Sequence, residues 1–507
     1  MTKPQAGPSL GQFKPDRAGH MGLLVSAGTV LTVLLAAVLL FLLIFSRGAR
    51  TFWPRDLNLV RHVDGRTFLA EVLDVREDGS VKMRTGNRDL DQERRDFFIF
   101  NEAEITLEAQ PENAVWVERL EHGPVHAFFK AVRMPNAEGS DGEFSDSESL
   151  LVFQAQVAEL RSQYAASQTQ LGRMANAEND EGIRAAQQES SRIRAELTRY
   201  GMHVELPNGH AHEIDGEDVV KVIFPNQLGA QEKVGVWFGQ LWSFITAGPR
   251  DNNTSGGVWP ALIGTSLLVI LMSVLVMPFG ILAAVYLNEY AKASVWVNLV
   301  RIAVNNLAGV PSIVYGVFGL GFLIYGVGGF VDFIFFGEAL PKPTIGTHCV
   351  LWASVTMALL TLPVVIVATE EGLRACPLPW REGALAMGAT RWEMMRKVIL
   401  PAARPGILTG LILAVSRAAG EVAPLMLTGV VNFAHDLPID GTAPFVHLNR
   451  QFMHLGFHIY SVGFQAPNVE AAEPLVYSTA ALLLLLILLL NLTAIRLRFR
   501  ARKALEQ

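Results

Sequence analysis

The sequence contains little cysteine and little charge. Cys349 and Cys376 are the only cysteines among 507 residues, which is too few for a disulfide scaffold. Charged residues make up 18% of the chain, half of all residues are hydrophobic, and the mean hydropathy is positive at +0.29. Disordered chains and nucleic-acid-binding proteins need a more polar composition, so both classes are excluded. The composition favours a membrane protein.

Sequence signatures of catalysis are also missing. The chain has no Gly-Lys dipeptide, and therefore no phosphate-binding loop of the Gly-x-x-x-x-Gly-Lys-Ser/Thr type. No grouping of a nucleophile with a base, or of metal ligands, stands out from the rest of the sequence. We therefore predict no catalytic residue, no metal site and no cofactor, and an enzyme is the least favoured class. If the chain is part of an ATP-driven pump, the ATPase is a separate chain.

Long apolar runs are abundant. Residues 22–46 are long enough to cross a bilayer, which requires about 20 apolar residues. A cleavable signal peptide is the alternative, but its apolar region is typically about 7–15 residues long and an Ala-x-Ala cleavage site does not follow here. We therefore expect a membrane anchor. Five further spans are predicted near residues 258–286, 300–325, 348–369, 403–430 and 476–495.

The distribution of basic residues predicts the orientation in the membrane. Five Lys or Arg residues lie between positions 496 and 503, directly after the last span, and five more lie in the loop 370–402. Because basic loops remain in the cytosol, we expect this loop and the tails 1–21 and 501–507 on the cytosolic side. Residues 47–256 are then periplasmic, and the chain is a multi-pass protein of a bacterial inner membrane. Arg47 and Arg50, at the outer end of the first span, oppose this orientation.

Residues 51–255 form an acidic block with 21 basic and 34 acidic residues, whereas the remainder of the chain carries a net charge of +7. In residues 57–130, apolar and polar positions alternate between the turn signals Asp64-Gly65, Asp78-Gly79 and Gly86-Asn87. This pattern predicts the hairpins of a small β module. Residues 134–148 are expected to be a linker, and residues 202–224 alternate again and are expected to rejoin the β module.

A helical pattern occupies residues 150–199 of the same block. Apolar residues recur at helical spacing in two stretches, separated by the polar break at 176–182. Two apolar positions per heptad predict an antiparallel helical hairpin or a short coiled coil. The acidic block as a whole is either a structural spacer or a docking platform for a partner outside the membrane.

Two membrane-embedded stretches have unusual compositions. Gly309, Pro311 and Gly316 lie in the predicted span 300–325, where a helix break survives only if protein or a water-lined cavity satisfies the exposed backbone groups. Close helix packing is the alternative explanation. Arg417 and Glu421 are placed one helical turn apart in the span 403–430, although an arginine at the bilayer centre costs roughly 2.5–3.5 kcal/mol. Intramembrane ionisable residues indicate function, and an arginine beside a translocation route favours an anion. A salt bridge that only locks helices together is the alternative.

The charged segment 381–401 separates two apolar spans. Its first part suits a short helix over residues 379–387, which Gly388 ends because glycine tolerates a left-handed conformation. Thr390 and Glu393 form a capping box that begins a second helix. An ordinary cytosolic loop could have the same structure. However, the order Glu382, Ala384, Gly388, Val398 and Leu400-Pro401 resembles the EAA loop of ABC-importer permeases, through which an ATPase subunit moves the membrane domain. The chain departs from that pattern at Gly383, where alanine is usual, and at Val398 in place of isoleucine.

Residues 306–319 and 416–429, taken with the 381–401 loop, resemble the A-type (PstA-type) permease subunits of bacterial phosphate ABC importers, over roughly residues 237–500. The resemblance implies a mainly α polytopic protein of the type I ABC-importer permease fold. Six transmembrane helices and a core at 257–500 are expected, with an inserted α+β extracytoplasmic domain. It also implies a PstC-type sister permease, two PstB-type ATPase subunits and a PstS-type periplasmic phosphate-binding protein as partners. Gly383, Thr390, Leu400 and Pro401 join Glu382, Ala384 and Gly388 as expected ATPase-coupling residues, and Arg417 and Glu421 are expected in the substrate pathway.

Two other functions remain open at this stage. A permease of this kind could import another oxyanion, such as molybdate, sulfate or phosphonate. A protein of a different class, a membrane-anchored sensor or scaffold, would act through the acidic block and would not need Arg417. Intramembrane charges and a coupling loop argue against the scaffold, which needs neither.

Overall fold

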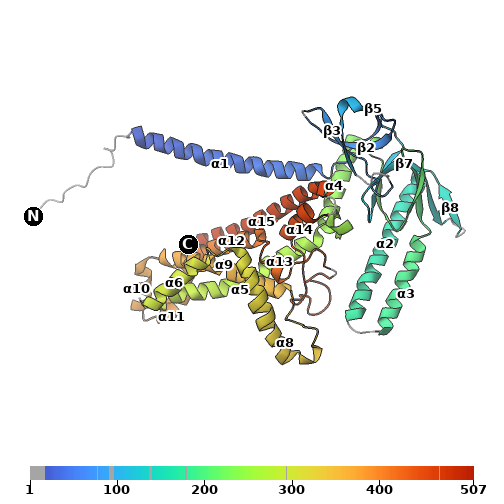
Figure 1. Cartoon of the computed structure of the whole chain (residues 1–507). Helices are drawn as coiled ribbons and strands as arrows, with labels where there is room; N and C mark the ends of the chain where they lie inside the picture. The colour runs from blue at the N-terminus through green and yellow to red at the C-terminus, as the bar shows by residue number, and fades with distance from the viewer. Residues whose placement is uncertain are drawn as a thin grey trace, which may run out of the picture.

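A computed structural model describes residues 17–506, except 77, 91–95, 136–139, 177–179, 293, 435 and 467–468. Most of the predicted tail 1–21 and parts of the predicted linker therefore lie outside the described residues. The chain has two parts: a membrane core of long helices and an inserted domain of strands and two helices at one end of that core (Figure 1). The loop that carries α10 and α11 lies at the opposite end of the core (Figure 1). We call these the domain end and the loop end.

In the part of the chain that the structure describes, six helical segments are long and apolar enough to cross a membrane. They comprise Leu24–Arg50, Trp259–Tyr290, Ser312–Phe335, Val350–Arg374, Arg391–Gly420 and Ala472–Lys503. The mainly helical membrane fold with an inserted α+β domain, predicted from the sequence, is confirmed.

The helices of the core differ in length and in regularity. Several contain a π-helical turn at one end, such as Tyr286–Tyr290 after α5 and Met395–Ile399 before α12. Short helices occupy the connections. The core helices are α1 (Arg17–Arg50), α4 (Ala230–Thr246), α5 (Trp259–Val285), α6 (Val295–Leu307), α7 (Ser312–Phe318), α8 (Gly329–Phe335), α9 (Val350–Arg374), α10 (Leu378–Ala386), α11 (Arg391–Met394), α12 (Leu400–Gly420), α13 (Leu425–Thr428), α14 (Leu455–Tyr460) and α15 (Val469–Glu506).

Two span boundaries differ from the sequence prediction. The third span runs over residues 312–335 instead of 300–325, because Pro311 has an extended backbone (φ −55°, ψ 136°) and separates α6 from α7. The predicted span 403–430 stops being helical at Gly420, since Glu421 is extended (φ −85°, ψ 132°). A composition window detects apolar length but not these interruptions. Both interruptions affect the candidate site.

Two antiparallel sheets form most of the inserted domain. The first has the strand order β4-β3-β2-β1-β5 and the second β10-β9-β7-β6-β11, with β8 paired to β7. The strands are β1 (Leu57–His62), β2 (Thr67–Val75), β3 (Ser80–Arg84), β4 (Phe97–Asn101), β5 (Ile105–Ala109), β6 (Ala114–Arg119), β7 (Val125–Pro135), β8 (Asp141–Phe144), β9 (Gly201–Glu205), β10 (Ala211–Asp215) and β11 (Val219–Ile223). A two-stranded ribbon, β12 (Pro249–Arg250) and β13 (Ser255–Gly256), precedes α5.

The predicted turns of the β module have different outcomes. Gly65 and Gly79 have φ values of +87° and +76° and lie in tight turns between β1 and β2 and between β2 and β3. Gly86-Asn87 does not make a hairpin turn, because it begins a longer connection from β3 to β4. The Asn87 side chain donates to the His126 carbonyl at 2.9 Å and accepts from the His126 amide at 3.0 Å, so it joins the first sheet's connection to β7.

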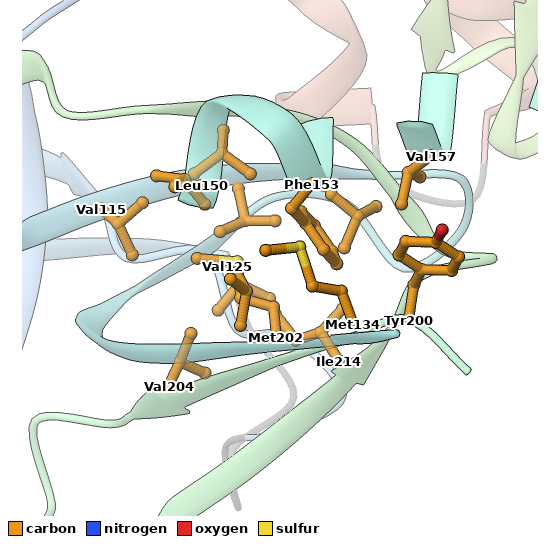
Figure 2. Close-up of a cluster of buried hydrophobic side chains, with 14 of the residues drawn as sticks. Val115, Val125, Met134, Leu150, Phe153, Val157, Tyr200, Met202, Val204 and Ile214 are labelled. Atoms are coloured by element: carbon orange, nitrogen blue, oxygen red, sulfur yellow. The ribbon is translucent and has the colours of Figure 1, made fainter. Parts of the chain in front are cut away.

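The helical pair α2 (Ser147–Asn176) and α3 (Asp180–Leu197) forms the predicted hairpin and projects from the second sheet (Figure 1). Phe153 of α2 is fully buried against the strands, next to Tyr200 and Met202 (Figure 2). The hairpin seam includes buried Val157 and Leu197. The inserted domain therefore has a hydrophobic core of its own.

Candidate translocation site and coupling loop

The Arg417–Glu421 pair lies where a span stops being helical. The Arg417 Nε and a Glu421 carboxylate oxygen are 3.7 Å apart, and the side chains are 31% and 27% exposed. Arg417 belongs to the last turn of α12, where the unpaired helix carbonyls favour a cation. Glu421 is the first residue beyond the helix, so the two are not on one helical face as the sequence pattern predicts. The pair still forms, because the extended residue leaves the carboxylate beside the guanidinium.

Helix α12 ends at Gly420, and the chain just beyond this end packs against α7. A Cβ atom on Gly316 would lie 2.8 Å from the Pro424 Cα, so only glycine permits this approach. Tyr315 of α7 is 7% exposed, belongs to the same buried cluster as Val422, and donates its hydroxyl to the Leu307 carbonyl at 2.8 Å. Non-helical backbone at this depth is tolerated where protein covers it. Gly316 therefore supports the break that places Glu421.

Gly309 and Pro311, expected to break a membrane helix from within, instead precede it. The Gly309 amide donates to the Asn306 carbonyl at 3.0 Å in a turn between α6 and α7. Pro311 is the capping residue of α7, where the missing amide hydrogen costs no helix hydrogen bond. The break exists, but it separates an amphipathic helix at the loop end from the third span.

The loop 381–401 has the local structure that its sequence predicts. Helix α10 ends at Ala386, and Gly388 has φ +87°, the left-handed conformation that glycine adopts at lowest cost. The Thr390 hydroxyl accepts from the Glu393 amide at 3.2 Å, and the Glu393 carboxylate accepts from the Thr390 amide at 3.0 Å. These reciprocal bonds form a capping box that begins α11.

The two faces of the loop differ. Ala384, Val398 and Leu400 pack against the buried cluster around Ile366 and Met395. Glu382 and Gly383 are exposed, and a Cβ on Gly383 would meet no atom within 4 Å. Several large apolar side chains also face outward. They are Leu378 (69% exposed), Trp380 (47%), Leu385 (45%), Met387 (89%) and Trp392 (53%). An apolar patch beside charged residues marks an interaction surface.

An ion-pair network that sequence analysis missed ties α10 to the core. Arg381 pairs with Glu289, in the π-helical turn that ends α5, and also donates to the Leu373 carbonyl at 2.7 Å. The Arg381 and Glu289 side chains are only 18% and 13% exposed. These partners lie 92 and 8 residues from Arg381, so no short-range periodicity could have indicated the contact.

A second arginine continues the network at the loop end. Arg301 of α6 donates to the Leu287 carbonyl at 2.7 Å and lies 3.7 Å from Glu370 of α9. Arg374 also pairs with Glu370, at 3.1 Å. The network therefore connects α5, α6, α9 and α10. Arg381 holds α10 against the end of α5 and against α9, and Arg301 connects those two helices to α6.

Neither cysteine participates in this site. Both thiols are buried and free, and burial raises the pKa of the Cys376 thiol, which makes it a poor nucleophile. Within the described residues, no group of three His, Cys, Asp or Glu side chains could hold a metal ion.

Comparison with known proteins identifies the membrane core. Residues 276–503 match the family of binding-protein-dependent transport system inner membrane components. The "Phosphate transport system permease protein PstA 1" of Mycobacterium tuberculosis is 32% identical over 260 residues, which cover 51% of this chain and 76% of the relative. The chain belongs to this permease family. The resemblance to ABC-importer permeases of the PstA type, seen first in the loop 381–401, is thereby confirmed.

Two further relatives support the assignment. The "Phosphate transport system permease protein PstA" of Yersinia pestis is 36% identical over 190 residues, covering 37% of this chain and 58% of the relative. The "Probable ABC transporter permease protein YqgI" of Bacillus subtilis is 28% identical over 258 residues, covering 50% and 81%. The family match begins at residue 276, so it leaves out the inserted domain.

Proposed function

We propose that this permease is the transmembrane subunit of an ATP-driven importer that moves inorganic phosphate into the cytoplasm. The observation that carries the proposal is the coupling loop: an exposed apolar surface on α10 and α11 joined to the ends of three core helices by Arg381 and Arg301. A loop built this way receives force from a partner and passes it on. The assignment of phosphate as the substrate rests on the relatives that are named phosphate transport permeases.

The partners follow from this assignment. Two ATPase subunits supply the work, one of them through the loop containing Glu382, Gly388 and Thr390. A sister permease completes the translocation route, and a periplasmic binding protein delivers the substrate. These correspond to the PstB-, PstC- and PstS-type subunits. The loop end and both termini face the cytosol in the inner membrane, and the inserted domain faces the periplasm.

Arg417 and Glu421 form the substrate-pathway element of the proposal. About a third of the Arg417 side chain remains exposed, although this cation lies at the end of an apolar helix. Its planar guanidinium suits phosphate oxygens, and Glu421 weakens the attraction enough for the anion to leave. The pair lies beside the break at 421–424, where a small movement of α7 against Pro424 changes the geometry.

Uptake of labelled phosphate into proteoliposomes tests the pathway. In the reconstituted importer carrying Arg417→Ala and Glu421→Ala, the uptake rate is expected to fall at least about tenfold. A tenfold change corresponds to about 1.4 kcal/mol of free energy. The matched control is the exposed pair Arg61–Glu108 of the inserted domain, replaced in the same way, which should leave uptake unchanged. Full uptake by the Arg417/Glu421 variant would exclude a pathway role.

The same assay separates phosphate from other oxyanions. Unlabelled molybdate, sulfate or phosphonate in excess should compete poorly, and stronger competition by one of them than by phosphate would reassign the substrate. Deletion of residues 55–250 tests the scaffold alternative. If that deletion abolished function while the Arg417 variant retained it, the inserted domain would be the working part.

Association with the ATPase is a separate test. Replacement of Glu382 by Lys together with Gly388 by Val is expected to reduce co-purification of the ATPase, because the first reverses an exposed charge and the second disfavours a left-handed turn. Gly383→Ala is the conservative comparison within the same loop, because alanine is the usual residue of the EAA pattern at this position and the added methyl group meets no atom. Unchanged co-purification of the double variant would contradict the coupling role.

A further inference from the structure

Helix α4 joins the inserted domain to the second span and has an apolar inner face. Trp237, Leu241 and Phe244 pack with Phe52, which follows α1, and with Leu482 of α15. The Trp237 indole donates to the Ala49 carbonyl at 2.7 Å. These contacts hold α4 against the domain-end termini of α1 and α15, near the α1–α4–α15 junction seen in Figure 1.

An apolar stripe lies beside this inner face, on the exposed side of α4. Val234, Phe238 and Trp242 recur every four residues and are 42%, 60% and 68% exposed, so they form one stripe. The sequence from Val234 to Pro249 contains no charged residue. A helix facing water on every exposed side would carry polar side chains in place of this stripe. A helix with a broad apolar side and a polar or small remainder is typical of one that lies in the surface of a membrane.

The stripe lies at the same end of the core as other apolar surface that is exposed in the structure. The apolar side chains of α1 are exposed along its length, as expected for a span that contacts acyl chains. Trp53, just after α1, and Trp259, at the start of α5, are 42% and 37% exposed at the same end of the core. Tryptophan is enriched where a membrane meets water.

We propose that α4 lies in the membrane–water interface at the domain end, with Val234, Phe238 and Trp242 in contact with lipid. Gly235 and Gly239 have open space around them and would suit close packing of another helix. Phe238 and Trp242 are large and exposed beside these glycines, which disfavours the close approach of another helix. Lipid, which conforms to the projecting rings, is the occupant that fits.

This contact fixes the position of the inserted domain. Lys233, at the start of α4, pairs with Asp56 at 2.5 Å, and the Asn226 side chain accepts from the Leu57 amide at 2.8 Å. Asp56 belongs to the segment that connects α1 to β1, and Leu57 is the first residue of β1. A lipid-seated α4 therefore holds the base of the domain at a constant height above the bilayer, independently of which substrate the permease carries.

Spin-label accessibility in the complete importer, reconstituted in phospholipid vesicles, tests the proposal. A label at Phe238→Cys should collide several-fold more with oxygen, which concentrates in lipid, than with a water-soluble nickel chelate. The matched control is Leu151→Cys on α2, which is 67% exposed and should show the opposite order. Leu35→Cys on α1 provides the lipid reference. The native cysteines are buried and should remain unlabelled.

Two results would overturn the proposal. Preferential collision of the Phe238 label with the nickel chelate would place α4 in water. Shielding from both reagents in the importer, but not in the permease chain reconstituted alone, would show that another subunit covers the stripe. Trp242→Cys reports on the same stripe, so a folding defect of one variant does not leave the question open.

Discussion

The inserted domain and the membrane core differ in how much apolar and charged surface they leave exposed. In the inserted domain, two sheets and the α2–α3 hairpin enclose their own apolar clusters, and surface charges form local pairs such as Arg61–Glu108 and Lys130–Glu205. In the core, α1 exposes apolar side chains along its length, α10 exposes an apolar patch, and Arg417 remains part-exposed. The domain buries its apolar clusters within its own chain, whereas the core leaves apolar surface and a charged pair exposed. Changes inside the domain should therefore alter stability, and changes at the unfinished surfaces of the core should alter function.

The largest expected effect is on the stability of the inserted domain. Phe153→Ala removes a fully buried ring that packs 6.1 Å from Tyr200, measured between ring centroids, and should destabilise the domain by about 3–5 kcal/mol. Leu151→Ala on the same helix is the control, because Leu151 is 67% exposed. Urea unfolding of the full chain in detergent, followed by protease sensitivity of residues 57–227, measures both. A loss of uptake per assembled importer in Phe153→Ala would contradict the separation of the two regions.

The next effect concerns acid stability of the same domain. Burial, together with nearby Arg84, lowers the pKa of His126 from 6.5 to about 3. The unfolded chain then binds a proton below pH 6.5 that the folded domain does not bind until about pH 3. Stability must fall as the pH falls through that window, by about 2 kcal/mol at pH 5. Urea midpoints at pH 7 and pH 5 should differ less in His126→Gln than in the unaltered chain. Equal differences would show that His126 is not the group responsible.

A functional effect without a comparable stability effect is expected at the loop end. Glu289→Gln weakens the link between Arg381 and α5 while the bond from Arg381 to the Leu373 carbonyl remains. The phosphate transported per ATP hydrolysed should fall about tenfold, or about 1.4 kcal/mol of coupling. Lys397→Gln is the matched control, since Lys397 pairs with Glu393 only within its own helical segment and is 71% exposed. If both variants change the ratio equally, the network does not transmit the movement.

The smallest effect is expected at Gly383. Its position in the interior of α10 is open, and alanine is favoured over glycine in a helix by roughly 0.5–1 kcal/mol. Gly383→Ala should therefore stabilise α10 slightly, seen as slower hydrogen exchange over residues 378–387. ATPase association should be retained, because alanine is the usual residue of the EAA pattern at this position. Faster exchange would show that the loop requires flexibility at this point.

Local chemistry explains why much of the fold and loop could be predicted from the sequence. The capping box of Thr390 and Glu393, the left-handed Gly388, and the glycine turns at Gly65 and Gly79 involve neighbours within a few residues. The number of apolar spans follows from the length of the apolar runs, although two of the span boundaries do not. The family pattern in the loop 381–401 was recognisable because its residues are close in sequence.

The features that sequence reasoning missed depend on distant contacts. The order of the sheets, the Arg381–Glu289 pair and the position of Gly316 against Pro424 bring together residues separated by tens to hundreds of positions. The end of α12 at Gly420 was missed because the mainly apolar run from Val422 to Val430 resembles a continuing span. Packing against α7, not hydropathy, accommodates the chain there.

The sequence by itself determined that this protein has six apolar spans, an acidic insert, an EAA-type loop and an Arg417–Glu421 pair. Each of these features can be recognised from composition and from the spacing of nearby residues. The thickness of a bilayer sets the length of a span, and helix geometry sets the spacing of residues that lie close together. Only the tertiary structure decided that the pair is held at a helix end, that Arg381 links α10 to α5 and α9, and that α4 exposes an apolar stripe beside its inner face. Those properties arise where separate elements pack, and the free energy of such contacts depends on which side chains meet across them.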